Sequence, residues 1–300
     1  MQITKLIKQD LQDISQKPIG NFQLIRAKSG VYVYRCLYNG IPAVVKYFEN
    51  ESDRREILNY QILQRHNIPT IQTLAFGKAS IVMEDISVSE NWRLGMAEDL
   101  NDTEVAKNLA RWYFMFHENG ADAKELSDLY FEYDRITTEN LELLANKLPA
   151  AQDLFQFLLA HYDKLYALIH KPAFTLTYND FYWVNFVVRK DKTAAMMFDY
   201  NLLGKGYRFS DFRNVCSSLS DAAEQAFRAE YERLYLVKHG HSRVADAEKM
   251  EQAIDEVLSP LFSLMVAYFD REHFPDWAEE DKLKAVDGRL LAKAKQLLQG

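Results

Sequence analysis

The chain has 300 residues, of which 48% are hydrophobic and 26% are charged, and this balance is typical of a folded globular protein and excludes a disordered one. Acidic residues (43) outnumber basic residues (36), so the formal net charge of −7 argues against nucleic acid as a partner. A chain of this length can form one large domain or two lobes that share a cleft.

The amino terminus does not predict a secretion signal, because charged residues interrupt the apolar positions of MQITKLIKQDLQDI. The longest apolar run, LSPLFSLMVAYF, is too short to cross a bilayer and contains a proline. We therefore expect a cytoplasmic protein without a membrane partner. Two cysteines, Cys36 and Cys216, provide neither a disulfide scaffold nor a zinc ligand set, so we expect both to be buried thiols.

Residues 20–86 have the pattern of a small antiparallel sheet with one helix. Two runs of β-branched and aromatic residues flank Asn39-Gly40, which favours a hairpin because both positions tolerate positive φ. A helix is predicted in SDRREILNYQILQRH, with Ser52 or Asp53 as its cap. It places three apolar residues on one face: Ile57, Tyr60 and Leu63. Two further strands are predicted in TIQTLAFG and ASIVMEDI.

After residue 100 the apolar spacing becomes helical. A helix with an Asn/Asp/Thr cap is predicted in NDTEVAKNLARWYFMFHENG, closed by its final glycine. The next helical segment opens with Pro149 in its first turn and stops at Pro172. Residues 221–299 are predicted to be mostly helical, with breaks near Pro260 and Pro275.

The change of pattern after residue 86 indicates an α+β fold in two parts. Residues 1–86 would form a lobe made of a sheet and one helix, and residues 87–300 a larger, mostly helical lobe. The sequence contains no internal repeat, low-complexity tract or obvious linker.

One strand–turn–strand pattern, NFVVRKDKTAAMMFDYN, interrupts the helical region. If its strands pair about a turn near Asp191, then Asn185 lies opposite Phe198 and Asp199 falls beside it. Asp180, in the preceding loop, can approach the same point. Two carboxylates and an amide oxygen form a hard, anionic cluster of the kind that Mg²⁺ prefers. We therefore predict a magnesium site, because such groups are costly to leave unpaired near apolar neighbours.

The segment YNDFYWVNF followed by MMFDYN resembles the catalytic loop and metal-binding aspartate motif of the aminoglycoside phosphotransferase and choline kinase-like family. Asn185 follows Asp180 by five residues and Asp199 follows it by 19, as in that pattern. The resemblance implies a protein-kinase-like, two-lobed fold with a small antiparallel-sheet N-lobe and a larger, mostly helical C-lobe. It implies Asp180 as the catalytic residue, Asn185 and Asp199 as ligands of Mg²⁺, and a structural role for Asp211.

The first 86 residues supply the nucleotide-binding parts in the order that the resemblance implies. AVVKYF is similar to the kinase strand VAIK, so Lys46 would contact the α and β phosphates and Glu56 would hold Lys46 in place. The other implied cofactor-binding residues are Ser29 and Gly30 in the phosphate-covering loop, Met83 in the adenine pocket, and Glu84 and Ile86, whose backbone would bind the base. This loop is much poorer in glycine than the GxGxxG loop of protein kinases.

The implied activity is transfer of the γ-phosphoryl group of ATP, or GTP, to a hydroxyl of a small molecule such as an aminoglycoside, an amino alcohol or a sugar. Tyr178 stands where the family usually has histidine, and Asn179 where glycine is common. A tyrosine that stacks or hydrogen-bonds can brace the metal loop instead. The alternative is a catalytically inactive, nucleotide-binding pseudokinase that acts as a sensor or scaffold. In either case we expect a monomer or homodimer.

Taken singly, the candidate residues have simpler interpretations. A lysine at the end of an apolar strand is often a surface residue, and a glutamate beside two arginines is often a solvated helix charge, as Lys46 and Glu56 would be. Asp180, Asn185 and Asp199 can each be turn or cap residues. Their common order along the chain favours the kinase hypothesis.

Overall fold

The computed structural model describes residues 2–15, 17–243 and 247–299. The chain forms two compact units, each assembled from three segments. Unit 1 comprises Met1–Glu125, Tyr178–Leu203 and Asn214–Leu234, and unit 2 comprises Leu126–Thr177, Gly204–Arg213 and Tyr235–Gly300. The functional boundary expected at residue 86 stays a prediction.

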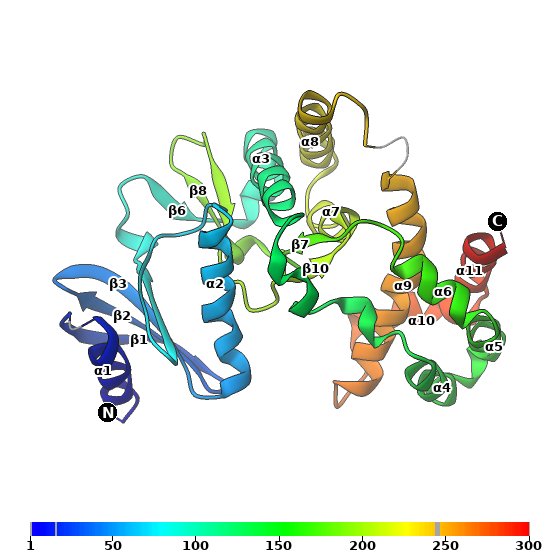
Figure 1. Ribbon diagram of the computed structural model, residues 1–300, viewed down its shortest axis with the longest axis horizontal. Coiled ribbons are helices and arrows are strands. Elements are labelled where there is room, and N and C mark those ends of the chain that lie inside the picture. The colour runs from blue at the N-terminus through cyan, green and yellow to red at the C-terminus, as the bar shows by residue number, and fades with distance from the viewer. Residues whose placement is uncertain (1, 16, 244–246, 300) are drawn as a thin grey trace. The chain divides into compact units, whose positions relative to one another are not determined.

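Unit 1 contains a five-stranded antiparallel sheet with the strand order β1-β2-β3-β5-β4. Its strands are β1 (Ile19–Lys28), β2 (Val31–Tyr38), β3 (Ile41–Phe48), β4 (Thr73–Phe76) and β5 (Ser80–Glu84). The predicted hairpin is confirmed, because Asn39 and Gly40 join β2 to β3 with φ of 50° and 79°. Figure 1 shows α1 on one side of this sheet and α2 on the other.

The helix α1 (Gln2–Ser15) was not predicted from the sequence. Its apolar positions recur every four residues, so Ile7 and Leu11 are fully buried against Cys36, Val45 and Val82 of the sheet. Asp10 accepts three hydrogen bonds from the turn between β4 and β5, namely from the backbone N–H groups of Lys78 (2.9 Å) and Ala79 (3.1 Å) and from the hydroxyl of Ser80. The helix is therefore fastened to the sheet by both apolar and polar contacts.

The predicted helix after β3 is α2 (Arg55–Arg65), and the 3₁₀ turn η1 (Glu51–Arg54) precedes it. The predicted cap is wrong, because Ser52 and Asp53 lie inside η1, where the Asp53 carboxylate accepts a hydrogen bond from Asn50 (3.1 Å). The predicted apolar face is confirmed, since its three residues are buried: Ile57, Tyr60 and Leu63. The helix therefore packs with the expected side toward the sheet.

A second sheet in unit 1 has the order β6-β8-β9, with β6 (Trp92–Leu94), β8 (Phe186–Arg189) and β9 (Ala195–Met197). Phe186 pairs with Met197, and the backbone N–H of Phe198 donates to the carbonyl of Asn185 (2.9 Å). The predicted hairpin register is thus confirmed, with Asn185 opposite Phe198.

The helix α3 (Thr103–Gly120) packs against β9. The side chain of Asp102 caps it by accepting from the N–H groups of Glu104 (2.9 Å) and Val105 (3.2 Å). The helix ends at Gly120, as predicted. The predicted apolar positions are all buried: Val105, Leu109, Trp112, Tyr113 and Phe116.

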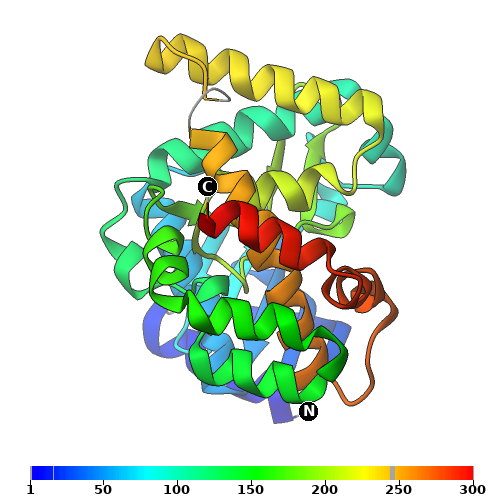
Figure 2. The ribbon, with the colours of Figure 1, turned by 90° about the vertical axis from the view of Figure 1, so that its right-hand side faces the viewer.

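Unit 2 is mainly helical, as predicted for the chain after residue 100. Its helices are α4 (Thr138–Lys147), α5 (Gln152–Ala160), α6 (Tyr162–Ile169), α9 (Ala247–Phe269), α10 (Glu279–Val286) and α11 (Arg289–Gln299). The short strands β7 (Thr175–Thr177) and β10 (Gly204–Gly206) pair within it, whereas α7 (Arg208–Cys216) and α8 (Asp221–His239) each cross from one unit to the other. Figure 2 shows α5, α9 and α11 side by side around the apolar core of this unit.

The break predicted near Pro260 is wrong, because this proline lies inside α9. Proline in a helix interior costs about 3 kcal/mol, but Leu258, Leu261 and Leu264 around it are fully buried, and this apolar burial outweighs the cost. The break near Pro275 is confirmed between α9 and α10. The segment that begins at Pro149 is divided into α5 and α6 by His161, which leaves the helical conformation at ψ 20°.

Within the described ranges, no helix combines the length and apolar character needed to cross a membrane. Cys36 and Cys216 are free and buried, which confirms the prediction for both thiols.

Candidate active site

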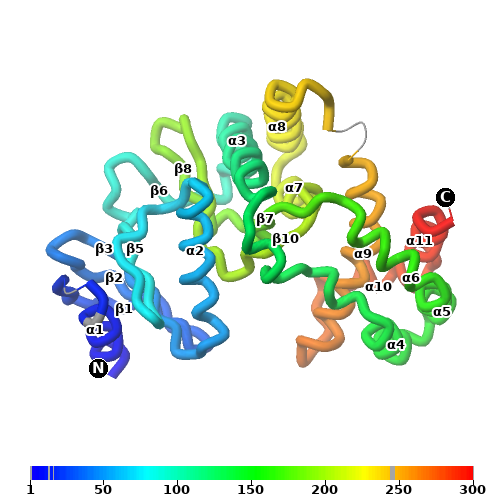
Figure 3. Tube along the Cα trace, viewed as in Figure 1, coloured from blue at the N-terminus to red at the C-terminus, as the bar shows by residue number. Residues whose placement is uncertain are grey.

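A cavity of about 510 Å³ lies in unit 1, a volume in the range of small-molecule sites. Strands β1, β2, β3 and β5, the start of α2 and the residues after β9 form its walls, and these segments can be followed along the tube in Figure 3. Seven of the predicted site residues line the cavity: Ser29, Lys46, Glu56, Met83, Glu84, Ile86 and Asp199. Gly30, Asp180 and Asn185 are not among its lining residues.

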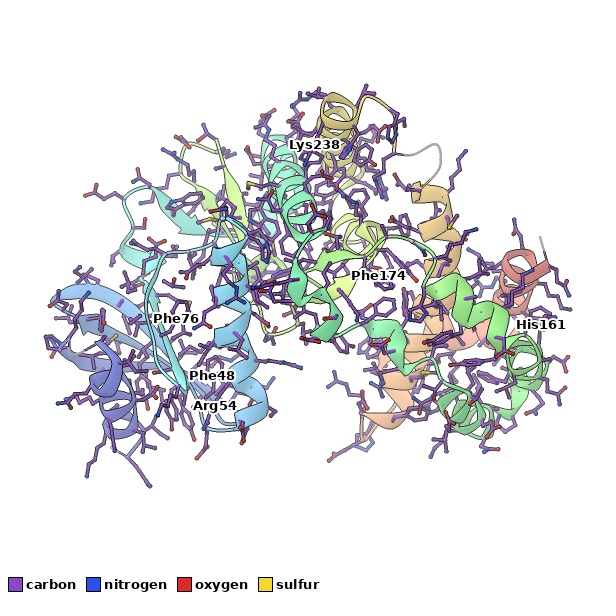
Figure 4. The ribbon with its side chains drawn as sticks, in the orientation of Figure 1. Phe48, Arg54, Phe76, His161, Phe174 and Lys238 are labelled. Carbon is purple, nitrogen blue, oxygen red and sulfur yellow. The ribbon has the colours of Figure 1, made fainter. Side chains whose placement is uncertain are left out.

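Lys46 lies on the central strand β3, and its Nζ atom contacts two carboxylates. It lies 2.5 Å from Oε2 of Glu56 and 2.9 Å from Oδ1 of Asp199. The ring of Phe48, labelled in Figure 4, is 5.5 Å from the same nitrogen. Burial alone would lower the pKa of Lys46, but the two carboxylates outweigh burial and raise that pKa, so the ammonium stays charged.

Glu56 comes from the first turn of α2 and is almost fully buried. Burial raises the pKa of Glu56 to about 7, while the charge of Lys46 acts in the opposite direction. One carboxylate oxygen of Glu56, Oε1, has no hydrogen-bond partner among the described residues. Lys46 therefore favours the ionised form of this buried carboxylate against the effect of burial.

Asp180 and Asn185 are linked across the loop that precedes β8. The side-chain amide of Asn185 donates to the backbone carbonyl of Asp180 (3.1 Å) and to its Oδ2 atom (3.1 Å). Because the amide nitrogen is used in this way, the amide oxygen of Asn185 is left as an acceptor. Burial raises the pKa of Asp180 to about 6, and the negative charge of Asp199 adds to the effect.

The backbone at Asp199 is left-handed, with φ of 64°, an uncommon conformation for a residue with a side chain. Its N–H donates to the hydroxyl of Tyr60 on α2 (3.2 Å). The fully buried Tyr178 donates its hydroxyl to the carbonyls of Phe198 and Asp199. Tyr178 thus makes the hydrogen bonds expected of a substitute for the family histidine, and α2 supports the same loop.

Asn179 also has a left-handed backbone, with φ of 62°, at the position where glycine is common in the family. Asparagine tolerates this conformation better than most residues. Its side-chain amide donates to the carbonyl of Leu202 (3.1 Å). The left-handed conformation at this position is therefore compatible with asparagine.

The segment after β5 carries the predicted base-binding residues Glu84 and Ile86. Between them, Asp85 caps the turn η2 (Ile86–Val88) by accepting from the N–H (3.0 Å) and hydroxyl (2.7 Å) of Ser87. Arg35 on β2 approaches the same carboxylate at 2.8 Å. Sequence reasoning missed this pair. The Asp-x-Ser spacing is a local signal for the cap, but nothing in the sequence indicates the partner 50 positions away.

The predicted phosphate-covering loop is a two-residue turn between β1 and β2. Ser29 and Gly30 both have positive φ, 50° and 81°. The Gly30 carbonyl accepts from the N–H of Glu49 (2.9 Å), and the Ser29 carbonyl accepts from the Asn50 side chain (3.2 Å). The positive φ favours glycine at Gly30, and a Cβ atom there would lie 2.5 Å from Nδ2 of Asn50, so a larger residue would displace the Asn50 side chain.

Two polar residues near the site were not predicted. Asn59, buried on the apolar side of α2, donates to the carbonyl of Tyr200 (2.7 Å) and ties the helix to the loop after β9. Asn201 lines the cavity, and its Oδ1 atom is buried with no hydrogen-bond partner among the described residues. The sequence does place Asn59 on the apolar face of the predicted helix, and a polar residue in that position indicates a buried hydrogen bond.

The donor set fits Mg²⁺. Glu56 and Asp199 contact the ammonium of Lys46, Asp180 is near enough that its pKa is raised by burial and also by the charge of Asp199, and Asn185 adds an amide oxygen. Hard oxygen donors with an excess of negative charge suit this cation. Across the described ranges, no cluster of three or more His, Cys, Asp or Glu side chains is arranged to hold a metal ion. Mg²⁺ commonly completes its shell with water and phosphate oxygens, so Asn185 and Asp199 would supply only part of it.

Solved structures of several phosphotransferases have the same fold as this chain. The chain is similar to choline kinase LicA from Streptococcus pneumoniae (16% identity, TM-score 0.62, covering 97% of this chain and 100% of that one). It is also similar to the macrolide 2′-phosphotransferase MphH from Brachybacterium faecium (12% identity, TM-score 0.60, 92% and 96% covered). A third is spectinomycin phosphotransferase APH(9)-Ia in complex with ADP and spectinomycin (12% identity, TM-score 0.54, 98% and 96% covered). The predicted protein-kinase-like, α+β fold is confirmed.

No curated protein matches the sequence. The model of the APH family, the phosphotransferase enzyme family, matches residues 23–247, which is three quarters of the chain. The resemblance drawn from the catalytic-loop and metal-loop motifs is therefore confirmed. The chain belongs to the phosphotransferase enzyme family and is a phosphotransferase with an alcohol group as acceptor.

Proposed function

We propose that the chain is an ATP-dependent small-molecule kinase that transfers the γ-phosphoryl group to a hydroxyl of a small substrate. The observation that carries this proposal is the bridge from Lys46 to Glu56 and Asp199 at the wall of a cavity of about 510 Å³. A lysine held by a helix glutamate and placed beside a metal-loop aspartate is the arrangement that kinase-like phosphoryl transfer requires.

The nucleotide is bound by residues from both ends of the cavity. Lys46 contacts the α and β phosphates, while Glu56 limits its rotamers. The backbone of Glu84 and Ile86 hydrogen-bonds the edge of the base, and Met83 lines the base pocket. Ser29 and Gly30 cover the phosphates. GTP is the alternative donor, because backbone groups at the hinge can pair with either purine.

The chemical step is an in-line transfer with Asp180 as the positioning base. A bond forms between the acceptor oxygen and the γ phosphorus, and the bond from that phosphorus to the β–γ bridging oxygen breaks, so ADP leaves. The hydroxyl proton passes to a carboxylate oxygen of Asp180. Since the transition state is loose, this proton moves late and little basicity is needed. The amide of Asn185 fixes the rotamer of Asp180 for this role.

Bound at Asn185 and Asp199, Mg²⁺ would neutralise negative charge on the phosphate oxygens. The ion pair between Lys46 and Asp199 keeps the Asp199 carboxylate oriented toward the cavity. Tyr178 and Tyr60 hold the backbone on either side of that carboxylate. Most of the rate acceleration then comes from alignment and preorganised charge.

The acceptor is a small hydroxylated molecule, either an amino alcohol, an aminoglycoside or a sugar. Proteins with a similar fold act, by their names, on choline, a macrolide and spectinomycin. Next to Asp180, the ring of Tyr182 is about half exposed and stacks on Trp183, with 6.0 Å between ring centroids. This face can support the apolar side of an acceptor. The proposal includes a cytoplasmic location, where nucleoside triphosphates are supplied.

The test is a phosphorylation screen of small hydroxylated metabolites and aminoglycosides with ATP and GTP as donors, followed by the Asp180→Asn variant. We expect that variant to lose turnover while it binds nucleotide nearly as well as the original chain. Asp191→Asn is the matched control, since Asp191 is an exposed turn residue of the neighbouring hairpin, bonded to Thr193 (2.7 Å). Full turnover by Asp180→Asn would refute the assigned base. Nucleotide binding without transfer to any acceptor would favour the pseudokinase alternative.

A further inference from the structure

Three basic residues line the cavity without a direct contact to a carboxylate among the described residues, although burial raises the pKa of Glu56 and the charge of its neighbour Arg55 acts to lower that pKa. Arg26, Lys28 and Arg55 all contribute to its wall, and their side chains make no hydrogen bond or ion pair with any part of the chain that the structure describes. The two other cations of the cavity are paired, Arg35 with Asp85 at 2.8 Å and Lys46 with Glu56 at 2.5 Å. The cavity therefore contains three cationic side chains whose charges are not balanced by a direct contact.

These residues flank the turn expected to cover the phosphates. Lys28 is the last residue of β1, directly before Ser29, and Arg26 lies two positions earlier on the same strand. Arg55 is the first residue of α2, next to Glu56. Its neighbour Arg54, labelled in Figure 4, behaves differently, because its guanidinium donates to the backbone carbonyls of Phe48 (3.4 Å) and Glu49 (3.3 Å).

Other basic side chains of unit 1, such as Lys8 and Lys78, also make no ion pair among the described residues, but they do not line the cavity. Three other basic side chains of unit 1 do contact carboxylates: Arg93 with Asp99, Arg111 with Glu230, and Lys192 with Asp102. Like charges that face one cavity repel each other, and an anion between them removes that repulsion. Five of the described acidic residues also line the cavity, namely Asp53, Glu56, Glu84, Asp85 and Asp199, so the three cations favour an anionic ligand only where they lie.

The turn between β1 and β2 is too short to supply many backbone N–H groups to a phosphate, so cationic side chains would have to supply the remaining contacts. A glycine-rich loop binds phosphates with successive backbone N–H groups, but this turn has only two residues. Lys46 already shares its charge between two carboxylates. We propose that Lys28 and Arg55 bind the terminal phosphates of the nucleoside triphosphate directly, with Arg26 adding to the positive potential. This inference rests on the proposed function and names further nucleotide-binding residues for it.

The test measures how the effect of each substitution depends on the number of phosphates. Lys28→Met and Arg55→Met keep the side-chain length and remove the charge. By titration calorimetry we expect each to weaken ATP binding roughly tenfold and ADP binding less, because each variant loses a charged hydrogen bond to a phosphate oxygen. Binding of adenosine should not change. The affinity of each variant for ATP should also depend less on salt concentration than that of the original chain.

Lys78→Met is the matched control, since Lys78 is an exposed lysine in the turn between β4 and β5 and does not line the cavity. Lys28→Arg should restore ATP affinity, and the melting temperature of Lys28→Met without ligand should equal that of the original chain, since the Lys28 side chain has no hydrogen bond or ion pair with the described residues to lose. Unchanged ATP affinity in both Met variants would overturn the inference, as would equal losses for ATP and adenosine. An original chain that binds no nucleotide at all would overturn the proposed function together with this inference.

Discussion

The Nζ atom of Lys46 lies 2.9 Å from Oδ1 of Asp199, although 153 positions separate the two residues in the chain. Lys46 belongs to the central strand of the five-stranded sheet, and Asp199 follows the hairpin of β8 and β9. Their contact joins the two sheets of unit 1 at the cavity. Because Glu56 binds the same ammonium, changes at any of the three residues are expected to affect the other two.

The Lys46→Met substitution should lower stability as well as abolish turnover. It leaves the Glu56 carboxylate buried without its cation, which typically costs about 3–5 kcal/mol when one partner of a buried pair is removed. The double variant Lys46→Met/Glu56→Gln should recover most of that loss, because it no longer buries a charge, while it remains inactive. Urea unfolding of the three proteins measures this. Equal stability of the single and double variants would show that Glu56 is not ionised beside Lys46.

Turnover should fall at acidic pH, with a midpoint near the pKa of Asp180, which burial and Asp199 raise to about 6. Below this pH the carboxyl group is protonated and cannot accept the proton of the acceptor hydroxyl, so kcat/KM should drop roughly tenfold per pH unit. A bound cation favours the ionised form, and saturating Mg²⁺ should therefore move the midpoint to lower pH. The same raised pKa predicts that the stability contributed by Asp180 decreases as pH rises through about 6.

The pH profile of kcat/KM is measured with and without excess Mg²⁺, in a buffer series of constant ionic strength. Asp191→Asn should have the same profile as the original chain, since Asp191 is exposed in the hairpin turn. A rate that is flat from about pH 5 to 8 would be inconsistent with Asp180 as the proton acceptor.

Gly95→Ala should disturb the catalytic loop with little effect on nucleotide affinity. Gly95 follows β6, its N–H donates to the carbonyl of Phe186 (2.8 Å), and a Cβ atom here would collide with the backbone oxygen of Trp183. The loop between Asp180 and Asn185 would have to move, and a shift of about 1 Å can cost a hundredfold in rate.

The expected result is a large loss in kcat with a nearly constant Kd for ATP, measured by steady-state kinetics and calorimetry. Gly20→Ala is a suitable control, because a methyl group at Gly20 would have no atom within 4 Å and the backbone there has no positive φ. Comparable kcat values for the two variants would show that the close approach at Gly95 does not position the loop.

Tyr178→Phe should lower both stability and activity, because its hydroxyl donates to the carbonyls of Phe198 and Asp199. Removing a buried hydrogen-bond donor of this kind costs about 1–3 kcal/mol. Tyr207→Phe provides the comparison, since Tyr207 is equally buried and donates to the carbonyl of Ile169 (2.6 Å) in unit 2. Thermal unfolding should show a similar decrease in melting temperature for both variants, but only Tyr178→Phe should weaken Mg²⁺-dependent turnover. Identical kinetics in the two variants would assign Tyr178 a purely structural role.

Local patterns predicted the elements that depend on neighbouring residues. Asn39-Gly40 specifies its own turn, and Asp102 caps α3 through residues two and three positions away. The hairpin of β8 and β9 followed from strand periodicity and a short turn, and this placed Asn185 opposite Phe198. The order of motifs along the chain then carried the family resemblance.

Predictions about features that depend on tertiary packing were wrong, or such features were not predicted at all. Pro260 stays within α9 because of its buried surroundings, which no local rule includes. The pair of Arg35 and Asp85 joins β2 to the cap of η2, which are distant in sequence, and no local pattern indicates the partner across this distance. The helix α1 is short and mixed in charge, so its identity depends on the sheet surface that covers Ile7 and Leu11.

The fastening of α1 to the turn between β4 and β5 has a consequence for synthesis of the chain. Asp10 leaves the ribosome 70 positions before Ser80, the last of its hydrogen-bond partners. Until then Ile7 and Leu11 have no complete sheet to cover, and the nascent chain exposes an apolar helix face that favours aggregation. Any chain interrupted before β5 would keep that face exposed, so fragments of this length are expected to be insoluble or bound by chaperones.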